Sequence, residues 1–185
     1  MHTVRMRTGL VFLLLFLVGS PALAVAADGW SGNANLFLGG KFLDSNDWSP
    51  AQDQFEVGLM LDAQPPQWPL GLAADLLFGF SSGAGADVEI HEYDLGIRKV
   101  FEGLPLVHPY LGGGVSIETA QISSGGLSVD DTGVGYWVGG GLMAHVLSFL
   151  NLGVDLRYSS ASVKFSGFNI EAGGFHAGLI TGLHW

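Results

Sequence analysis

Several residue types are scarce in this 185-residue chain, and each scarcity excludes a class of protein. It contains no cysteine, which excludes a disulfide framework, a thiolate metal site and a cysteine nucleophile. Charged residues make up only 13% of the chain, and 7 Lys and Arg face 17 Asp and Glu, for a formal net charge of −10. An acidic surface repels phosphate backbones, so we expect no nucleic-acid partner.

Long apolar runs are also scarce, and the one that occurs is at the N-terminus. Two arginines precede a Leu- and Phe-rich core of about 11 residues at 9–19, shorter than the ~20 residues that a membrane-spanning helix needs. Small residues then give two overlapping cleavage signals. The pattern predicts a secretory signal peptide over residues 1–26, cut after Ala24 or Ala26, and a mature domain over residues 27–185. An uncleaved N-terminal anchor is the alternative.

What the chain has in abundance is alternation. After the N-terminal segment, apolar residues recur with a period of two in eight segments of roughly ten residues, the length of a tilted transmembrane strand. In one such segment Leu152, Val154 and Leu156 alternate with Gly153 and Asp155. The second face of the segments is mostly glycine, with ten charged residues: Lys41, Glu56, Asp62, Asp75, Glu92, Asp94, Arg98, Glu118, Asp155 and Arg157.

The connections between the segments alternate in length. Four polar stretches rich in Asp, Asn, Ser and Gly are expected to be long loops: 44–52, 81–88, 121–132 and 160–171. Three shorter connections lie between them, at 64–68, 101–108 and 147–149. Long loops at one end and short turns at the other are typical of an outer-membrane barrel.

Two features favour a membrane barrel over a soluble β-sandwich. The glycine-rich face lacks the polar coat of a water-facing sheet and suits a narrow interior, where eight strands leave room only for side chains. Aromatic residues also gather near the segment ends, as in the girdles of membrane barrels. Since lipid cannot satisfy backbone polar groups, the sheet must close. The predicted fold is all-β: an eight-stranded antiparallel up-and-down transmembrane β-barrel.

Three stretches carry a resemblance to a known family. Residues 177–185 resemble the C-terminal signal read by the bacterial outer-membrane assembly machinery, with Trp185 where Phe is more frequent. Residues 109–116 and 152–158 look like segments of the small OmpA-like, or opacity-type, outer-membrane β-barrel superfamily. The resemblance implies location in the bacterial outer membrane, contact with its lipid and lipopolysaccharide, and recognition by the barrel-assembly machinery through Trp185.

Enzymatic and metal-binding roles find little support. Some small outer-membrane barrels modify lipid A with Ser, His and an acid, and Ser159, Ser160, Glu171 and His176 lie near the last predicted loop. However, no His closely precedes these serines, and His176 has inward parity. We therefore expect no enzyme, no catalytic residue, no cofactor and no metal site. The histidines show no ligand spacing; His145 and His184 are expected to share a polar network near the short turns.

The favoured function is a structural or surface-interaction role, with a lumen filled by side chains. An alternative is a narrow barrel for small hydrophobic molecules, as proposed for OmpW-like relatives; a lipid A-modifying enzyme is a weaker one. Seven acids in or next to the predicted long loops are expected to form a negative outer rim: Asp44, Asp47, Asp53, Asp87, Asp130, Asp131 and Glu171.

The ion pairs of the lumen can also be predicted in outline. Buried charges need partners, and arginine can bind several carboxylates at once. We expect Arg157 to be the central counter-ion, meeting acids such as Glu56, Glu92 or Glu118. Arg98 is expected near Asp62.

Overall fold

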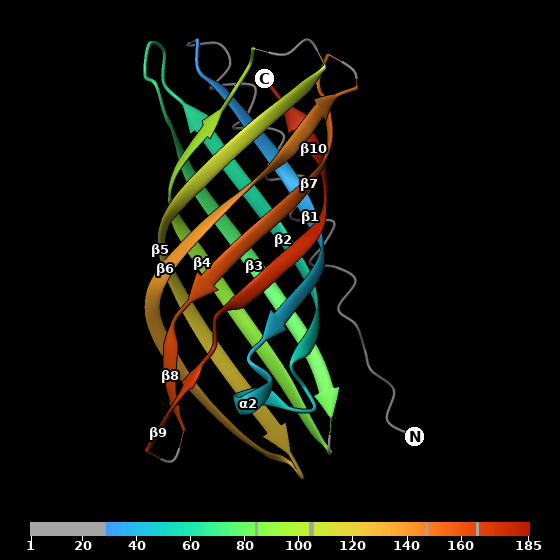
Figure 1. Cartoon of the computed structure of the whole chain (residues 1–185), viewed down its shortest axis with the longest axis vertical. Helices are drawn as coiled ribbons and strands as arrows, with labels where there is room; N and C mark the ends of the chain where they lie inside the picture. Colours follow the sequence, from blue (N-terminus) through green and yellow to red (C-terminus); the bar gives the residue numbers. More distant parts are fainter. Residues whose placement is uncertain (1–28, 84, 104–105, 147, 166) are drawn as a thin grey trace.

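The computed structural model describes residues 29–83, 85–103, 106–146, 148–165 and 167–185, so the predicted signal peptide lies outside the described residues. Eight long antiparallel strands close into a barrel in the order β1-β10-β7-β6-β5-β4-β3-β2 (Figure 1). These strands are β1 (Ser31–Leu43), β2 (Asp53–Gln64), β3 (Gly71–Gly83), β4 (Ala86–Val100), β5 (Val107–Ser124), β6 (Leu127–His145), β7 (Leu150–Ser160) and β10 (Gly174–His184). The predicted fold class is confirmed.

The first and last strands of the barrel pair with each other, which removes the open edge. The β1–β10 ladder runs from the pair Asn33 and His184 to the pair Leu43 and Gly174. It is extended at one end by two backbone hydrogen bonds of 3.1 Å between Gly32 and Trp185. Among the described residues, no helix is long and apolar enough to cross a membrane.

The alternation predicts which side chains face outward on all eight strands. Outward residues such as Leu38 and Leu179 are 54% and 64% exposed, although they are apolar. Their inward neighbours are closed off: Phe37 and Ile180 are each 2% exposed. An apolar exterior is the reverse of a soluble domain and matches a barrel surrounded by lipid.

The short connections lie at one end of the barrel, together with Trp185, and this is called the turn end. The opposite end, lowest in Figure 1, carries α2, β8 and β9 and is called the loop end. The predicted loop 44–52 is confirmed, but its single helical turn α2 (Ser45–Trp48) was not predicted. Asp44 caps this turn by accepting a 2.8 Å hydrogen bond from the Asn46 N–H, the role for which Asp is favoured at that position.

Two other predicted loops are wrong in extent, because the strands continue through most of them. β3 runs to Gly83 and β4 begins at Ala86, while β5 and β6 are joined by Gly125 and Gly126 alone. Both glycines have positive φ, 59° and 85°, which is the backbone required by a two-residue hairpin turn. The backbone hydrogen-bond ladder continues to these turns, and inward residues of the extensions, Val88 and Ile122, pack in the apolar cluster at this end.

The predicted loop 160–171 is also mostly extended. It forms a separate hairpin of β8 (Ser162–Phe165) and β9 (Phe168–Glu171) between β7 and β10. β8 packs against β6, and the hairpin lies at the same end of the barrel as the tips of the β3–β4 and β5–β6 hairpins (Figure 1). Side chains from this hairpin and from α2 therefore help to cover the loop end.

Candidate functional site

The lumen concentrates the chemistry of the chain. The ten charged residues predicted to face inward are all buried, with exposed fractions of 7% or less: Lys41, Glu56, Asp62, Asp75, Glu92, Asp94, Arg98, Glu118, Asp155 and Arg157. Seven carboxylates thus share the interior with two arginines and one lysine. Such charges are tolerated in a barrel core only when they bind one another.

Two pairs of carboxylates lie directly opposite each other on neighbouring strands, and each pair has a cation between its members. Glu92 on β4 faces Glu118 on β5. Lys41, from β1 across the lumen, places its Nζ 2.6 Å from Glu92 and 2.8 Å from Glu118. Like charges at directly opposed sheet positions repel, so Lys41 is the group that makes this pair tolerable.

The second carboxylate pair is Asp75 on β3 and Asp94 on β4, and Arg157 lies between them. Its guanidinium nitrogens lie 3.0 Å from Asp75 and 2.9 Å from Asp94, and its Nε lies 3.0 Å from Asp155. Arg157 is therefore the central counter-ion, as predicted.

The predicted partners of Arg157 were wrong. The expected partners were Glu56, Glu92 or Glu118, whereas Glu92 and Glu118 bind Lys41 and Glu56 binds His176. The reason is geometric: strands tilt in a barrel and their register is staggered, so counting residues from a strand end does not give depth.

Arg98 joins the Arg157 group at its turn-end side. It lies 3.3 Å from Asp62, as predicted, and 2.6 Å from Asp75, so that one Asp75 oxygen serves both arginines. The Trp137 ring lies 5.8 Å from the Arg98 guanidinium carbon and 5.3 Å from that of Arg157. An aromatic face at this distance attracts a cation. The contact of Trp137 with the two arginines was not predicted from the sequence.

Glycines on the inner face provide the space for these large side chains. A Cβ added at Gly139 would approach the Arg157 Cβ to 2.7 Å, and one added at Gly112 would approach the Trp137 ring to 2.9 Å. Gly112 on β5 and Gly139 on β6 are thus close-packing positions, in agreement with the narrow interior expected for the glycine-rich face.

A Ser–His–Glu arrangement lies on the loop-end side of the charged groups. His176 Nδ1 is 2.9 Å from Glu56, and its Nε2 is 3.0 Å from Ser159 Oγ. Ser159 and His176 were expected near each other, but the acid expected beside them, Glu171, instead accepts a 2.6 Å hydrogen bond from the Ala161 N–H. Ser159 and His176 are both 0% exposed, and Glu92 accepts a 3.1 Å hydrogen bond from the same hydroxyl. The trio belongs to the buried polar network, not to an accessible catalytic site.

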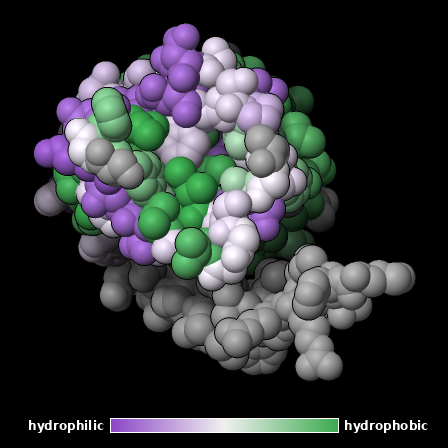
Figure 2. All heavy atoms as spheres, turned by 90° about the horizontal axis from the view of Figure 1, so that it is seen from below, coloured by the Kyte–Doolittle hydropathy of each residue, from purple (hydrophilic) through white to green (hydrophobic). Residues whose placement is uncertain are grey.

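Apolar layers close the lumen beside this network. One is a lid at the loop end, built around Trp48, Ile90 and Val163, whose exposed fractions are 5% or less. Figure 2, which views this end, shows apolar residues at its centre and hydrophilic residues around them. The Trp48 indole N–H donates a 2.6 Å hydrogen bond to the Glu171 carbonyl, so α2 is bound to the β8–β9 hairpin.

The second apolar layer consists of inward residues of six strands: Phe37, Met60, Leu77, Tyr110, Met143 and Ile180. They are 2% exposed or less and pack against one another. The Tyr110 hydroxyl donates a 2.6 Å hydrogen bond to Asp155, which joins this layer to the charged network.

The turn end of the lumen is polar and aromatic. Asn33, Asn35 and Asn151 are linked by amide hydrogen bonds of 2.8 and 3.1 Å. The predicted proximity of His145 and His184 is found as a stack with ring centroids 3.8 Å apart, and His108 stacks on the other face of His145 at 3.9 Å.

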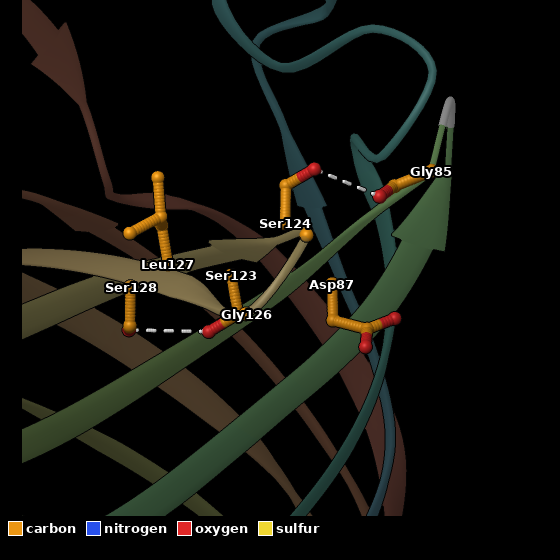
Figure 3. A pocket seen from close by; sticks show the side chains of 8 residues that line it. Gly85, Asp87, Ser123, Ser124, Gly126, Leu127 and Ser128 are labelled. Atoms are coloured by element: carbon orange, nitrogen blue, oxygen red, sulfur yellow. Dashed lines mark hydrogen bonds between the residues drawn. The ribbon is translucent and has the colours of Figure 1, made fainter. Parts of the chain in front are cut away.

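A small hollow at the loop end lies outside the lumen, between the β3–β4 and β5–β6 turns (Figure 3). Its described lining is mostly small and polar, and Asp87 is its one charged side chain. Ser124 donates a 3.1 Å hydrogen bond to the Gly85 carbonyl, which holds the two turns together. The hollow is part of the rim and has no contact with the ion network.

Comparison with known proteins supports the location and the fold. The model of one family, the outer membrane protein beta-barrel domain, matches residues 10–179. The search of curated proteins found no match. Among solved structures the chain is similar to Neisserial surface protein A (TM-score 0.67, 17% identity, 85% of this chain and 97% of that chain).

Two further structures are similar over most of their length. They are the attachment invasion locus protein Ail of Yersinia pestis (TM-score 0.58, 14% identity, 84% of this chain and 98% of that chain) and the N-terminal beta-barrel domain of Pseudomonas aeruginosa OprF (TM-score 0.52, 16% identity, 83% of this chain and 99% of that chain). At these identities the likeness is one of fold.

Proposed function

Because the chain belongs to the family of outer membrane protein beta-barrel domains, and is therefore a protein of the bacterial outer membrane, we propose that it acts through its outer surface and not through its lumen. Its role is that of a structural and surface-interaction barrel without enzymatic activity. The loop end faces the cell exterior and the turn end faces the periplasm, as in barrels with short periplasmic turns.

The observation that carries the proposal is the closed lumen. Ion pairs, two apolar layers and stacked histidines fill the described interior from one end to the other. An eight-stranded barrel is only just wide enough for its own side chains. Passage of solutes would require these layers to separate.

Conductance tests this part of the proposal. The refolded protein in a planar bilayer is expected to give no sustained porin-like current. Large, stable and frequent openings would contradict it and would favour the transport alternative.

The rim points to the chemistry of the surface partner. Acids in the loop-end connections include Asp44, Asp47, Asp87 and Asp130, which are exposed. Lys164 is the only Lys or Arg described in the loop-end segments 44–52 and 160–173. We therefore expect contacts with lipopolysaccharide phosphates through bridging divalent cations, or contacts with a basic partner, because each arrangement offsets the negative rim.

A matched pair of ligands tests the sign of the rim charge. A structure of Ail exists in complex with the heparin analogue sucrose octasulfate. This chain is expected to bind that polyanion weakly or not at all, and to bind lipopolysaccharide vesicles more tightly with Mg²⁺ than with a chelator. The Asp87→Asn variant should reduce the increase in vesicle binding that Mg²⁺ causes. Tight binding to sucrose octasulfate would contradict the negative rim as the binding surface. Vesicle binding that does not depend on Mg²⁺ would contradict the cation-bridged contact and favour a basic partner.

Recognition by the assembly machinery is a further part of the proposal. Trp185 extends the β1–β10 ladder through its backbone, and its ring covers Gly32. Trp185→Asp should leave the chain in the periplasm, whereas Trp185→Phe should assemble. Gel migration with and without boiling separates the outcomes, since a closed barrel keeps its compact form until heated. Equal assembly of Trp185→Asp would exclude Trp185 as the signal.

A further inference from the structure

Three side chains of the charged lumen have the composition of a metal site. Glu56 on β2, Glu92 on β4 and His176 on β10 are exposed by 1% or less. One ligand atom from each lies within 4.8 Å of the others. Two carboxylates and one imidazole, held by three separate strands of a closed barrel, form a ligand set that the rigid sheet keeps in place.

We propose that Glu56, Glu92 and His176 bind one divalent transition-metal ion inside the lumen, with Zn²⁺ as the ion that fits best. Imidazole suits Zn²⁺, which also accepts carboxylate oxygens, while Mg²⁺ prefers oxygen ligands alone. A tetrahedral ion with bonds of ~2.1 Å requires ligand atoms about 3.4 Å apart. His176 Nε2 lies 3.5 Å from Glu92, which is close to this spacing. Glu56 lies 2.9 Å from the other ring nitrogen, Nδ1. Because an ion binds one nitrogen of an imidazole, His176 or Glu56 must change rotamer for all three groups to bind the same ion.

A fourth ligand is also present. Ser159 Oγ lies 3.0 Å from His176 Nε2 and 3.1 Å from Glu92 Oε2. The hydroxyl therefore faces the space that these two groups share. It can bind the ion directly or orient the ligands, as hydrogen-bonding groups around metal ligands do.

Local charge independently favours a cation here. Glu56, Glu92 and Glu118 carry three negative charges, and Lys41 supplies one positive charge. With a neutral His176 the group keeps an excess of two negative charges in a buried place, which a divalent ion would offset. Glu92 Oε1 is also buried without a hydrogen-bond partner among the described residues, which leaves a carboxylate oxygen free to bind the ion.

A proton is the competitor for this position. If His176 carries both ring protons, it forms ion pairs with Glu56 and Glu92 and no metal binds. The two states differ in a measurable way, because only the metal state has stoichiometric Zn²⁺. Since the lid of Trp48, Ile90 and Val163 covers the site, an ion enclosed during folding should exchange slowly with chelators.

The experiment is refolding of the untagged chain into detergent micelles with Zn²⁺, followed by a chelator wash and metal analysis. The background variant is His145→Ser with His184→Ser, because the stacked histidines at the turn end could also take up Zn²⁺. One retained equivalent per barrel is expected. No retained metal would overturn the proposal and would favour the protonated His176.

Matched variants locate the ion. Glu56→Gln and His176→Gln should each lower retained Zn²⁺ by more than about tenfold. Asp94→Asn removes an equally buried carboxylate that binds Arg157 and should retain the full equivalent. Equal retention in all three variants would place the metal elsewhere and overturn the assignment.

A spectroscopic measurement does not depend on the folding of these variants, because it uses the chain with all three ligands intact. Refolding with Co²⁺ in place of Zn²⁺ should give intense visible absorption bands of four-coordinate Co²⁺ that persist after the chelator wash. Weak bands typical of hydrated six-coordinate Co²⁺, or bands that the wash removes, would contradict an enclosed site.

Discussion

The carboxylates of the lumen and those of the rim are the same residue types, but they bind different partners. In the lumen, Asp75 and Asp94 are 1% exposed and bind the guanidinium of Arg157. At the rim, Asp131 accepts a 2.6 Å hydrogen bond from the Lys164 N–H, and Asp47 one of 3.1 Å from the Glu171 N–H. Lumen acids depend on cations from distant strands, whereas rim acids hold loop backbones. Removing a partner should therefore lower the free energy of unfolding strongly in the lumen and only slightly at the rim.

The largest effect is expected for Arg157→Met. This change leaves three buried carboxylates without their shared cation, and breaking a buried ion pair by removing one partner costs about 3–5 kcal/mol. Equilibrium urea unfolding of the refolded barrel measures the loss. Lys164→Met is the matched control, since it removes an exposed cation and should cost less than about 1 kcal/mol. Similar losses in both variants would remove the contrast between lumen and rim.

The sequence alternation predicts which charged residues face the lumen and which lie at the rim. In a closed barrel every backbone group must pair, so each strand stays extended and its side chains alternate between lipid and lumen. The inward position of residues such as Arg157 and Asp75 follows from this alternation. Which charged side chains meet across the lumen does not follow from it, because these contacts depend on the stagger of the tilted strands. Lys41 and Glu118 are 77 residues apart, and no local pattern connects them.

The lack of local sequence signals for distant contacts also explains what was missed in the Ser159–His176–Glu56 group and in the loops. Ser159 and His176 could be paired from their nearness in sequence, but Glu56 lies 120 residues from His176 and could not. The β5–β6 extension was read as a loop because apolar alternation ends before the hydrogen-bond ladder does. A better signal was the Gly125-Gly126 pair itself, which favours a tight hairpin turn.

A double-mutant cycle on Lys41 and Glu118 is expected to give the next largest effect. Lys41→Met leaves the opposed carboxylates Glu92 and Glu118 facing each other, and adding Glu118→Gln removes one of the two charges. The double variant should therefore be more stable than the sum of the single changes predicts, with a coupling energy of about 1–3 kcal/mol. Urea unfolding of all four proteins measures it. Additive effects would show that Lys41 does not hold the pair together.

A smaller effect is expected where the lid meets the rim. Trp48→Phe keeps an aromatic side chain but loses the hydrogen bond to the Glu171 carbonyl, worth about 1 kcal/mol. Because the contact joins α2 to the β8–β9 hairpin, local opening should increase by about fivefold without a change in barrel stability. Hydrogen exchange of residues 44–52 and 160–173 reports the opening. Faster exchange throughout the barrel strands would mean that the lid supports the whole lumen.

The smallest effect is expected for Asp87→Asn at the rim. Asp87 is exposed beside the hollow of the β3–β4 and β5–β6 turns, so water already solvates its charge and the amide nearly preserves its shape. Exposed substitutions of this kind change stability by less than about 0.5 kcal/mol. Asp94→Asn makes the same chemical change in the lumen and removes a 2.9 Å ion pair with Arg157. In urea unfolding, Asp94→Asn should therefore lower the free energy of unfolding more than Asp87→Asn does, although the chemical change is the same. Equal losses would mean that burial does not determine how much these charges contribute to stability.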